Sequence, residues 1–372
     1  MPSRKLTPEE IRLQKEQERA YRMVQRMMEV MYGKTFALPE VRSAIKAAQK
    51  ASKPFYFDNY SGADKAVRKV MRSFSSEMKH TIIVGIQEAW EEGDKGLWRE
   101  IGGRLAKSSE EQEILNAIRA KATSASRSQN ALNSFIREKR GGYTLSDRVW
   151  KITEGSKKEI EIMIQNGIKE GLSADDMARQ VQKYLREPDR LFRRVRNAVT
   201  KKLELSEAAK KYHPGQGVYR SSYKNALRLV SNEINRSYRE STWLNFQKNP
   251  LVIGYEIQLS NNHTCSDGKG GIIPGWTDIC DELTGRYPKW FKWTGWHPNC
   301  RCRMIAILIS MKDFEARVKA RASGLLDDWE AKGSIDRLPQ ALLDWIGQNT
   351  GRIERASSLP YWIADNSTFL GV

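Results

Sequence analysis

Cysteine and histidine side chains gather in one part of this 372-residue sequence. All four cysteines lie within 38 residues, and two of the four histidines lie among or beside them. These residues are His263, Cys265, Cys280, His297, Cys300 and Cys302. Thiolate sulfur and imidazole nitrogen are the ligands that zinc prefers, usually four of them in a tetrahedron. In a compartment that keeps thiols reduced, such a cluster is typical of a metal site.

The spacing of the cysteines predicts how they would share one ion. Cys300 and Cys302 are two residues apart, so at the start of a strand both thiols point to the same side. Cys265 and Cys280 would close the site, which predicts a structural zinc ion with four cysteine ligands, one of them replaceable by His297 or His263. Because the separation of Cys265 from Cys280 is not that of a standard zinc knuckle, a disulfide or buried free thiols stay open as alternatives.

Catalysis at this cluster would need an open metal position and a nearby base. Asp281 and Glu282 are the carboxylates available, although we favour their interpretation as surface charges. No phosphate-binding glycine loop, Gly-x-Ser-x-Gly elbow or His-Glu-x-x-His helix occurs in the sequence. We therefore predict that the protein is not an enzyme. The alternative is a DNA-acting metalloenzyme, a nuclease or toxin-type effector that uses the cluster.

A second candidate site is a basic stretch in a strongly basic chain. The sequence has 63 Lys and Arg against 45 Asp and Glu, a formal net charge of +18. Half of this surplus lies between Lys183 and Arg228, where thirteen basic residues face four acidic ones. The expected phosphate contacts are Arg186, Arg190, Arg193, Arg194, Lys201 and Lys202. Without interleaved aromatic residues, the stretch predicts sequence-independent DNA contact; an acidic partner protein or a solvated surface are the alternatives.

The residues before the cluster predict a series of helices. Thr7 can cap the first helix, with Pro8 at its first position and Glu10 completing a capping box. Apolar residues at helical spacing predict helices over 7–32, 39–51, 63–92, 108–139, 173–185 and 218–246. Gly141-Gly142 interrupts the pattern, and residues 160–185 form a helical hairpin that turns at Gly171.

The periodicity changes around the cluster. Residues 251–259 alternate apolar and polar side chains, which predicts a strand with one buried face, and 304–309 predict a second, more buried strand. Further helices are expected over 311–322 and 339–346. The predicted fold class is mainly α with a small α+β module. The predicted domains are 1–140, helical; 141–245, helical with the basic stretch; 246–310, the β module with the Cys/His cluster; and 311–372, a helical and irregular tail.

Membrane and secretory segments are not expected. The longest apolar runs reach about six residues, whereas a membrane-spanning helix needs roughly twenty. The first ten residues are charged and lack the apolar core of a secretory signal. We therefore expect the chain to stay in the cytoplasm where it is made, or to enter an assembly built there.

The segment Gly295-Trp-His-Pro-Asn-Cys-Arg-Cys302, preceded by Cys280-Asp-Glu-Leu-Thr-Gly285 and by the strand over 251–259, resembles the phage Mu protein F-like head morphogenesis family of minor head proteins. Upstream, Arg228-Leu-Val-Ser-Asn-Glu233-Ile-Asn235 is similar to the segment that leads into the β module of that family. The resemblance covers residues 145–310, and its His-Pro-x-Cys-Arg-Cys ending is its most specific motif.

One departure from the family concerns the first two cysteines. The family usually has them as Cys-x-x-Cys, whereas here Cys265 and Cys280 bracket a glycine-rich insertion, which makes His263 the natural substitute for Cys265. The resemblance implies a structural protein of a tailed phage or prophage head. It implies a few copies inside the capsid, attached near the portal protein among other head proteins, that affect DNA packaging or ejection. The net charge of +18 agrees with a location among packaged phage DNA, and during assembly we expect the protein in the host cytoplasm.

Overall fold

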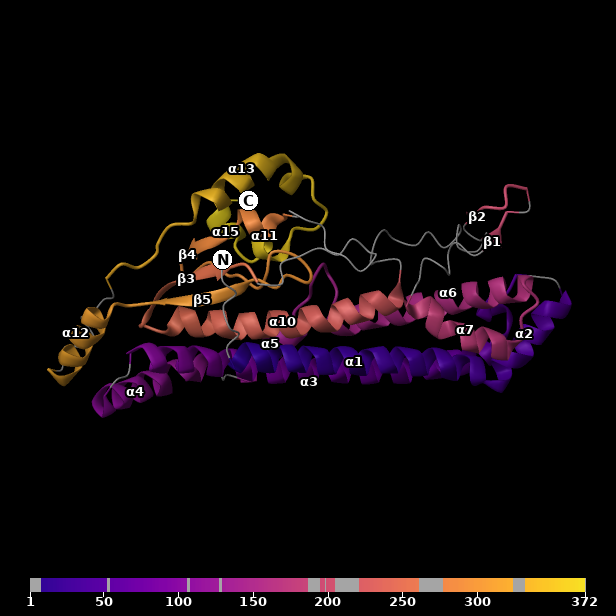
Figure 1. The fold of residues 1–372 in the computed structure, drawn as a ribbon, viewed down its shortest axis with the longest axis horizontal. Coiled ribbons are helices and arrows are strands. Elements are labelled where there is room, and N and C mark those ends of the chain that lie inside the picture. Colours follow the sequence, from indigo (N-terminus) through magenta and orange to yellow (C-terminus); the bar gives the residue numbers. More distant parts are fainter. Residues whose placement is uncertain are drawn as a thin grey trace. The chain divides into compact units, whose positions relative to one another are not determined.

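The computed structural model describes most of the chain (Figure 1). The described residues are 8–51, 54–105, 108–126, 129–186, 195–197, 199–204, 221–260, 277–323 and 332–371. They form a mainly helical protein with a small antiparallel sheet beside the Cys/His cluster, which confirms the predicted fold class. Among the helices of these ranges, none has the length and apolar composition needed to cross a membrane.

The chain divides into two compact units that are both discontinuous in sequence. Unit 1 comprises Met1–Gln17, Gly85–Gly141 and Asn232–Val372, and unit 2 comprises Glu18–Val84 and Gly142–Ser231. Three long helices have residues in both units: α1 (Pro8–Ala37), α3 (Ser61–Leu105) and α10 (Ser222–Lys248). The four consecutive domains expected from the sequence stay a prediction, although one boundary between the units coincides with Gly141-Gly142.

Helix α3 is longer than its sequence pattern suggests. We expected it to end at Glu92, before Gly93, but it continues to Leu105. Leu97, Trp98 and Ile101 lie in this continuation and are buried in the core of unit 1. Their burial stabilises the helix by more than glycine weakens it, because one helical glycine costs only about 1 kcal/mol.

In unit 1, Gly93 lets α3 and α10 approach closely. A Cβ atom at Gly93 would lie 2.5 Å from the backbone oxygen of Tyr238 and 3.0 Å from Cβ of Ser241. The hydroxyl of Ser241 donates a hydrogen bond of 2.7 Å to the backbone oxygen of Trp90. The two backbones therefore meet at a distance that only glycine permits.

Unit 2 contains the predicted helical hairpin. The remaining elements of this unit are α2 (Pro39–Ala51), η1 (Phe57–Asn59), α6 (Leu145–Lys169), α7 (Ala174–Arg186), β1 (Val195–Arg196) and β2 (Leu203–Glu204). Thr144 and Asp147 form a capping box that begins α6. Gly171 follows α6 with a φ of 71°, and the hydroxyl of Ser173 accepts the backbone N–H of Asp176 to begin α7.

A carboxyl group is buried inside unit 2. Glu159 of α6 is 4% exposed and accepts hydrogen bonds from the Tyr32 hydroxyl at 2.8 Å and the Ser222 backbone N–H at 2.7 Å. Burial raises the pKa of this carboxyl, because the charged form loses its hydration.

The sheet of unit 1 has three antiparallel strands in the order β4-β3-β5. They are β3 (Val252–Gln258), β4 (Gly285–Tyr287) and β5 (Arg303–Leu308), and the pairing places Tyr255 opposite Tyr287 and Ile257 opposite Met304. Both expected strands are present, but the prediction that the second is more buried was wrong. In β5 only Ala306 is fully buried, because this strand lies at an edge of the sheet.

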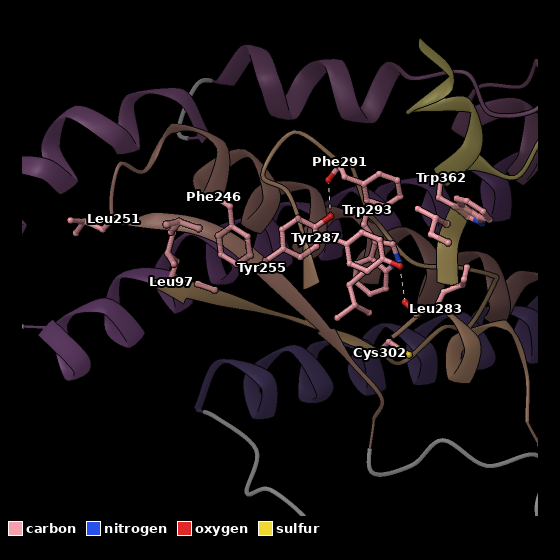
Figure 2. Close-up of a cluster of buried hydrophobic side chains, with 14 of the residues drawn as sticks. Leu97, Phe246, Leu251, Tyr255, Leu283, Tyr287, Phe291, Trp293, Cys302 and Trp362 are labelled. Carbon is pink, nitrogen blue, oxygen red and sulfur yellow. Dashed lines mark hydrogen bonds between the residues drawn. The ribbon is translucent and has the colours of Figure 1, made fainter. Parts of the chain in front are cut away.

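The sheet packs into an aromatic core (Figure 2). The other helices of unit 1 are α4 (Ser109–Ser126), α5 (Gln129–Arg137), α11 (Ile279–Glu282), α12 (Met311–Ala322), α13 (Gln340–Glu354), α14 (Tyr361–Ala364) and α15 (Ser367–Leu370). The Tyr255 hydroxyl donates to the backbone oxygen of Phe291 at 2.7 Å, and Tyr287 donates likewise to Leu283 at 2.9 Å. Trp362 of α14 lies in the same core as Cys302.

Candidate metal centre

Three thiols and one imidazole converge at one end of this core. Cys280 lies in α11, while Cys300 and Cys302 directly precede β5, and all three are buried. Their sulfur atoms lie within 4.8 Å of one another. The Cys280 and Cys300 sulfurs are 3.7 Å apart, and Nε2 of His297 is 3.0 Å from the Cys280 sulfur. The structure thus brings together four of the six predicted candidate ligands.

Helix α11 fixes the position of Cys280. Asp278 is the N-cap of this short helix, and its carboxylate accepts the backbone N–H of Cys280 at 2.7 Å. The Asp281 carboxylate accepts the backbone N–H of Asp278 at 2.8 Å, which completes a capping box. Asp281, one of the two carboxylates considered as a catalytic base, therefore has a structural role in the helix cap.

The loop before β5 positions the other ligands through two unusual backbone conformations. Gly295 has a φ of 129°, and a Cβ atom there would lie 2.8 Å from Nη1 of Arg239. Asn299 has a φ of 63°, and its backbone N–H donates to the Asn232 side chain at 2.7 Å. The Cys300 backbone N–H donates to the His297 oxygen at 3.1 Å. Both conformations lie in the segment that carries His297, Cys300 and Cys302.

Arg239 of α10 binds the backbone of this loop. Its buried guanidinium donates hydrogen bonds to the backbone oxygens of Thr294 at 3.1 Å, Cys300 at 2.7 Å and Cys302 at 2.9 Å. It also lies 4.9 Å from the ring centroid of Trp293. A single side chain thus satisfies three loop carbonyls next to the ligands, the kind of support that orients ligands in metal sites.

Two further residues of α10, Glu233 and Arg236, make polar contacts with other segments of unit 1. Arg140 forms ion pairs with Glu233 of α10 and, at 2.8 Å, with Glu138. Arg236 donates to the Thr294 hydroxyl at 3.2 Å. Glu233 belongs to the helical segment that the sequence resemblance singles out.

The imidazole of His297 is oriented for binding through Nε2. Its Nδ1 lies 2.7 Å from the backbone oxygen of Pro298, which can only accept, so Nδ1 carries a proton. Nε2 faces two electron-rich atoms, the Cys280 sulfur and Oδ2 of Asp278, each at 3.0 Å. A cation between these atoms, either a proton or a metal ion, satisfies all three.

The thiols differ in their ease of ionisation. Hydrogen bonds from Cys280 and Cys302 and the nearby guanidinium of Arg239 hold the pKa of Cys300 well below its usual range. The hydrogen bond to Cys300 raises the pKa of Cys280. A lowered pKa favours the thiolate form of Cys300, and thiolate is the form that binds metals.

One distance in the cluster matches a tetrahedral metal ion. Metal–sulfur bonds of about 2.3 Å in a tetrahedron separate two sulfurs by about 3.8 Å, close to the 3.7 Å between Cys280 and Cys300. The potential donors form two groups that share Cys280, one with Cys300 and Cys302 and the other with His297 and Asp278. The cluster of Cys280, Cys300, Cys302 and His297 can therefore hold a metal ion.

The structure describes only some of the other predicted site residues. His263 and Cys265 lie outside the described residues, as do Arg190, Arg193 and Arg194 of the basic stretch. Arg186 is the last residue of α7. Lys201 and Lys202 are exposed in the turn between β1 and β2, and DNA contact through this stretch stays a prediction.

Two features that support the site were not predicted from the sequence: the cap of α11 and the position of Arg239. The three-residue spacing of Asp278 and Asp281 is a capping signature that could have revealed α11. No comparable signal marks Arg239, because an arginine opposite the apolar face of a helix normally lies in solvent.

Known proteins offer no further guide to this centre. No family model, curated protein or solved structure matches the chain. The arrangement of Cys280, His297, Cys300 and Cys302 is therefore what a proposal for the function has to explain.

Proposed function

We propose that the chain is a minor head protein of a tailed phage or prophage whose Cys/His cluster binds one structural zinc ion. The observation that carries this proposal is the convergence of Cys280, His297, Cys300 and Cys302 within the segment of the family-like motif. Soft sulfur ligands with one imidazole in a tetrahedral arrangement select zinc among the common divalent ions.

A structural role for the ion is supported by the completeness of the ligand set. Four protein side chains fill a tetrahedron, whereas a catalytic zinc keeps one position for water. The Asp278 carboxylate accepts the backbone N–H of Cys280, and the Asp281 carboxylate accepts the backbone N–H of Asp278. Both carboxylates thus have a role in the cap of α11, which supports a structural ion.

The local fold explains why an ion would be useful here. β4 has three residues and α11 has four, so neither element is stable by itself. The ligands come from α11 and from the loop before β5, so zinc binding links two short elements and contributes directly to folding.

In the head, the protein would lie inside the capsid near the portal and assist assembly, packaging or ejection. The net charge of +18 supports a location beside packaged DNA, with backbone contacts from the basic stretch around Arg186–Lys202. The motif resemblance supports contacts with the portal protein and other head proteins.

Particle incorporation tests the head role. The chain should be produced together with the portal, scaffolding and capsid proteins of the phage or prophage that encodes it, and proheads isolated by sedimentation. Quantitative mass spectrometry should find a few copies per particle, and none in particles assembled without the portal protein. Absence from portal-containing proheads would contradict the proposal.

A plasmid assay tests the enzymatic alternative. The purified protein with supercoiled plasmid and Mg²⁺, Mn²⁺ or added Zn²⁺ should leave the plasmid intact. Cleavage that is abolished by His297→Ala or Cys300→Ser would overturn the structural role in favour of a nuclease.

A further inference from the structure

A row of basic side chains lies on one face of α3 within unit 2. Lys65, Lys69, Arg72 and Lys79 are all exposed, and Ser76 completes the row. With 3.6 residues per turn, these positions fall within an arc of about 80° and extend over about 21 Å of the helix. The four cations therefore form a straight stripe on a regular element, labelled α3 in Figure 1.

The charges of this row are not neutralised by the protein. None of the four side chains has an ion-pair or hydrogen-bond partner among the residues that the structure describes. The acids of this part of α3 are engaged elsewhere. Asp64 binds Arg68 at 2.8 Å and Lys157 at 2.7 Å, and Glu77 accepts a hydrogen bond from Ser73 at 3.0 Å.

The opposite face of the same helical segment is part of the core. Val67, Met71, Phe74 and Met78 are buried, which fixes the rotation of the helix and keeps the row in solvent. No large apolar side chain of the described α3 is exposed. A ligand of this face would thus be held by charge, without insertion of apolar groups into a membrane or a pocket.

We propose that the row formed by Lys65, Lys69, Arg72 and Lys79 is a contact surface for the phosphate backbone of double-stranded DNA. Duplex DNA carries one negative charge per about 1.7 Å of its axis, so phosphates are available along the whole row. The ammonium and guanidinium groups of lysine and arginine donate hydrogen bonds to phosphate oxygens, and such contacts carry no sequence information.

This surface is separate from the metal centre and from the predicted basic stretch. It extends the proposed function by adding a second DNA contact, located on a described helix. Its test does not depend on zinc or on head assembly, so failure here leaves the proposals for the metal centre and the head role standing.

The test measures duplex binding by the full-length protein as purified. Fluorescence anisotropy with a 30-base-pair duplex, at several salt concentrations, compares the wild type with the variant Lys65→Gln, Lys69→Gln, Arg72→Gln and Lys79→Gln. Each phosphate contact contributes about 0.9 to the slope of log affinity against log salt, so the variant slope should be smaller by about 3 to 4, with affinity reduced tenfold or more. Glutamine preserves the helix, because its helix propensity is close to that of lysine and arginine.

Two control variants make the test specific. Exchanging lysine and arginine at the four positions keeps the charge and should keep the slope. Replacing Lys312, Lys319, Arg352 and Arg355 by Gln removes four exposed charges from residues 311–372, where eight basic residues face nine acidic ones, and should leave the slope unchanged. An unchanged slope in the α3 variant, or an equal loss in this last control, would overturn the proposal.

Discussion

His297 is one of the two histidines that the sequence offered as a substitute for a cysteine ligand, and its imidazole lies beside the Cys280 sulfur. Three buried sulfurs leave one tetrahedral position, and Nε2 of His297 lies 3.0 Å from the Cys280 sulfur. Nδ1 of His297 donates to the backbone oxygen of Pro298, so the lone pair of Nε2 is available to the Cys280 side of the cluster. At this scale the metal centre depends on four side chains and on the residues that orient them.

Substitution of single candidate ligands should show which side chains bind the metal and which do not. Cys302→Ser or His297→Ala is expected to abolish the binding of about one zinc per chain and to lower the free energy of unfolding, because metal binding is coupled to folding. Metal analysis and thermal denaturation measure both effects. Cys265→Ser is expected to retain the metal, since the four donors are complete without it. Loss of zinc in that variant, or a metal-free wild type of full stability, would contradict this ligand set.

Arg239 should be important for stability although it is not a ligand. Arg239→Gln leaves loop carbonyls of Thr294, Cys300 and Cys302 without their donor, which should cost about 2 to 4 kcal/mol. Zinc affinity should fall by about 10- to 100-fold, as it does when supporting residues of metal sites are removed. Urea denaturation and competition with a chelator measure these changes. Arg286→Gln, at an exposed position of β4, is the control and should change little.

At the scale of elements, the close contact of α3 with α10 depends on glycine at position 93, which has no side chain. Gly93→Ala places a methyl group 2.5 Å from a backbone oxygen, and backbone cannot yield as a flexible side chain does. We expect a loss of about 1 to 3 kcal/mol in unfolding free energy. Gly103→Ala, in the same helix with open space around it, should instead stabilise by up to about 1 kcal/mol. Equal effects of the two substitutions would show that close packing is not the cause.

The buried carboxyl of α6 should make stability depend on pH. Its pKa is raised above the usual 4.5, so the folded state binds this proton more tightly than the unfolded state. The stabilisation from Glu159 is complete below pH 4.5 and is lost as the pH rises through the raised value. Relative to wild type, Glu159→Gln should therefore gain unfolding free energy between pH 4 and pH 8, measured by denaturant titration. Glu40→Gln, exposed in α2, controls for the loss of one carboxylate.

Sequence patterns located most elements because long periodic segments determine them. α2 and the hairpin of α6 and α7 match their expected positions, and β3 follows its alternating pattern. β4 was missed, since three residues are too few to show a period. The burial of β5 was misjudged because an apolar run does not reveal whether a strand lies at an edge.

The ligand residues were recognisable, but their combination was not. Residue types and spacing indicated Cys265, Cys280, Cys300 and Cys302, with His297 or His263 as a substitute for one of them. The choice depends on how the loop turns at Gly295 and Asn299 and on its attachment to Arg239. These contacts join segments about sixty residues apart, so local sequence could not predict them.

At the scale of the whole molecule, charge should control DNA binding. If the basic stretch contacts phosphates, replacing Arg186, Arg190, Arg193, Arg194, Lys201 and Lys202 by Gln should lower the salt slope by about 5. Anisotropy titrations with two unrelated duplex sequences measure the slope and should show equal losses. A loss confined to one sequence would indicate base reading, and no loss would leave this stretch as solvated surface.

The interleaved order of the two units has a consequence for biosynthesis. Unit 1 joins Glu10 to Arg303 by an ion pair of 2.9 Å, and these residues are 293 positions apart. At about 5 to 20 residues per second, a ribosome needs roughly 15 to 60 seconds to travel between them. The early part of α1 is therefore synthesised that long before its partner strand, and the cluster of Cys280, His297, Cys300 and Cys302 also emerges only near the end of this interval. During synthesis, the nascent chain must be kept from aggregation before unit 1 can close.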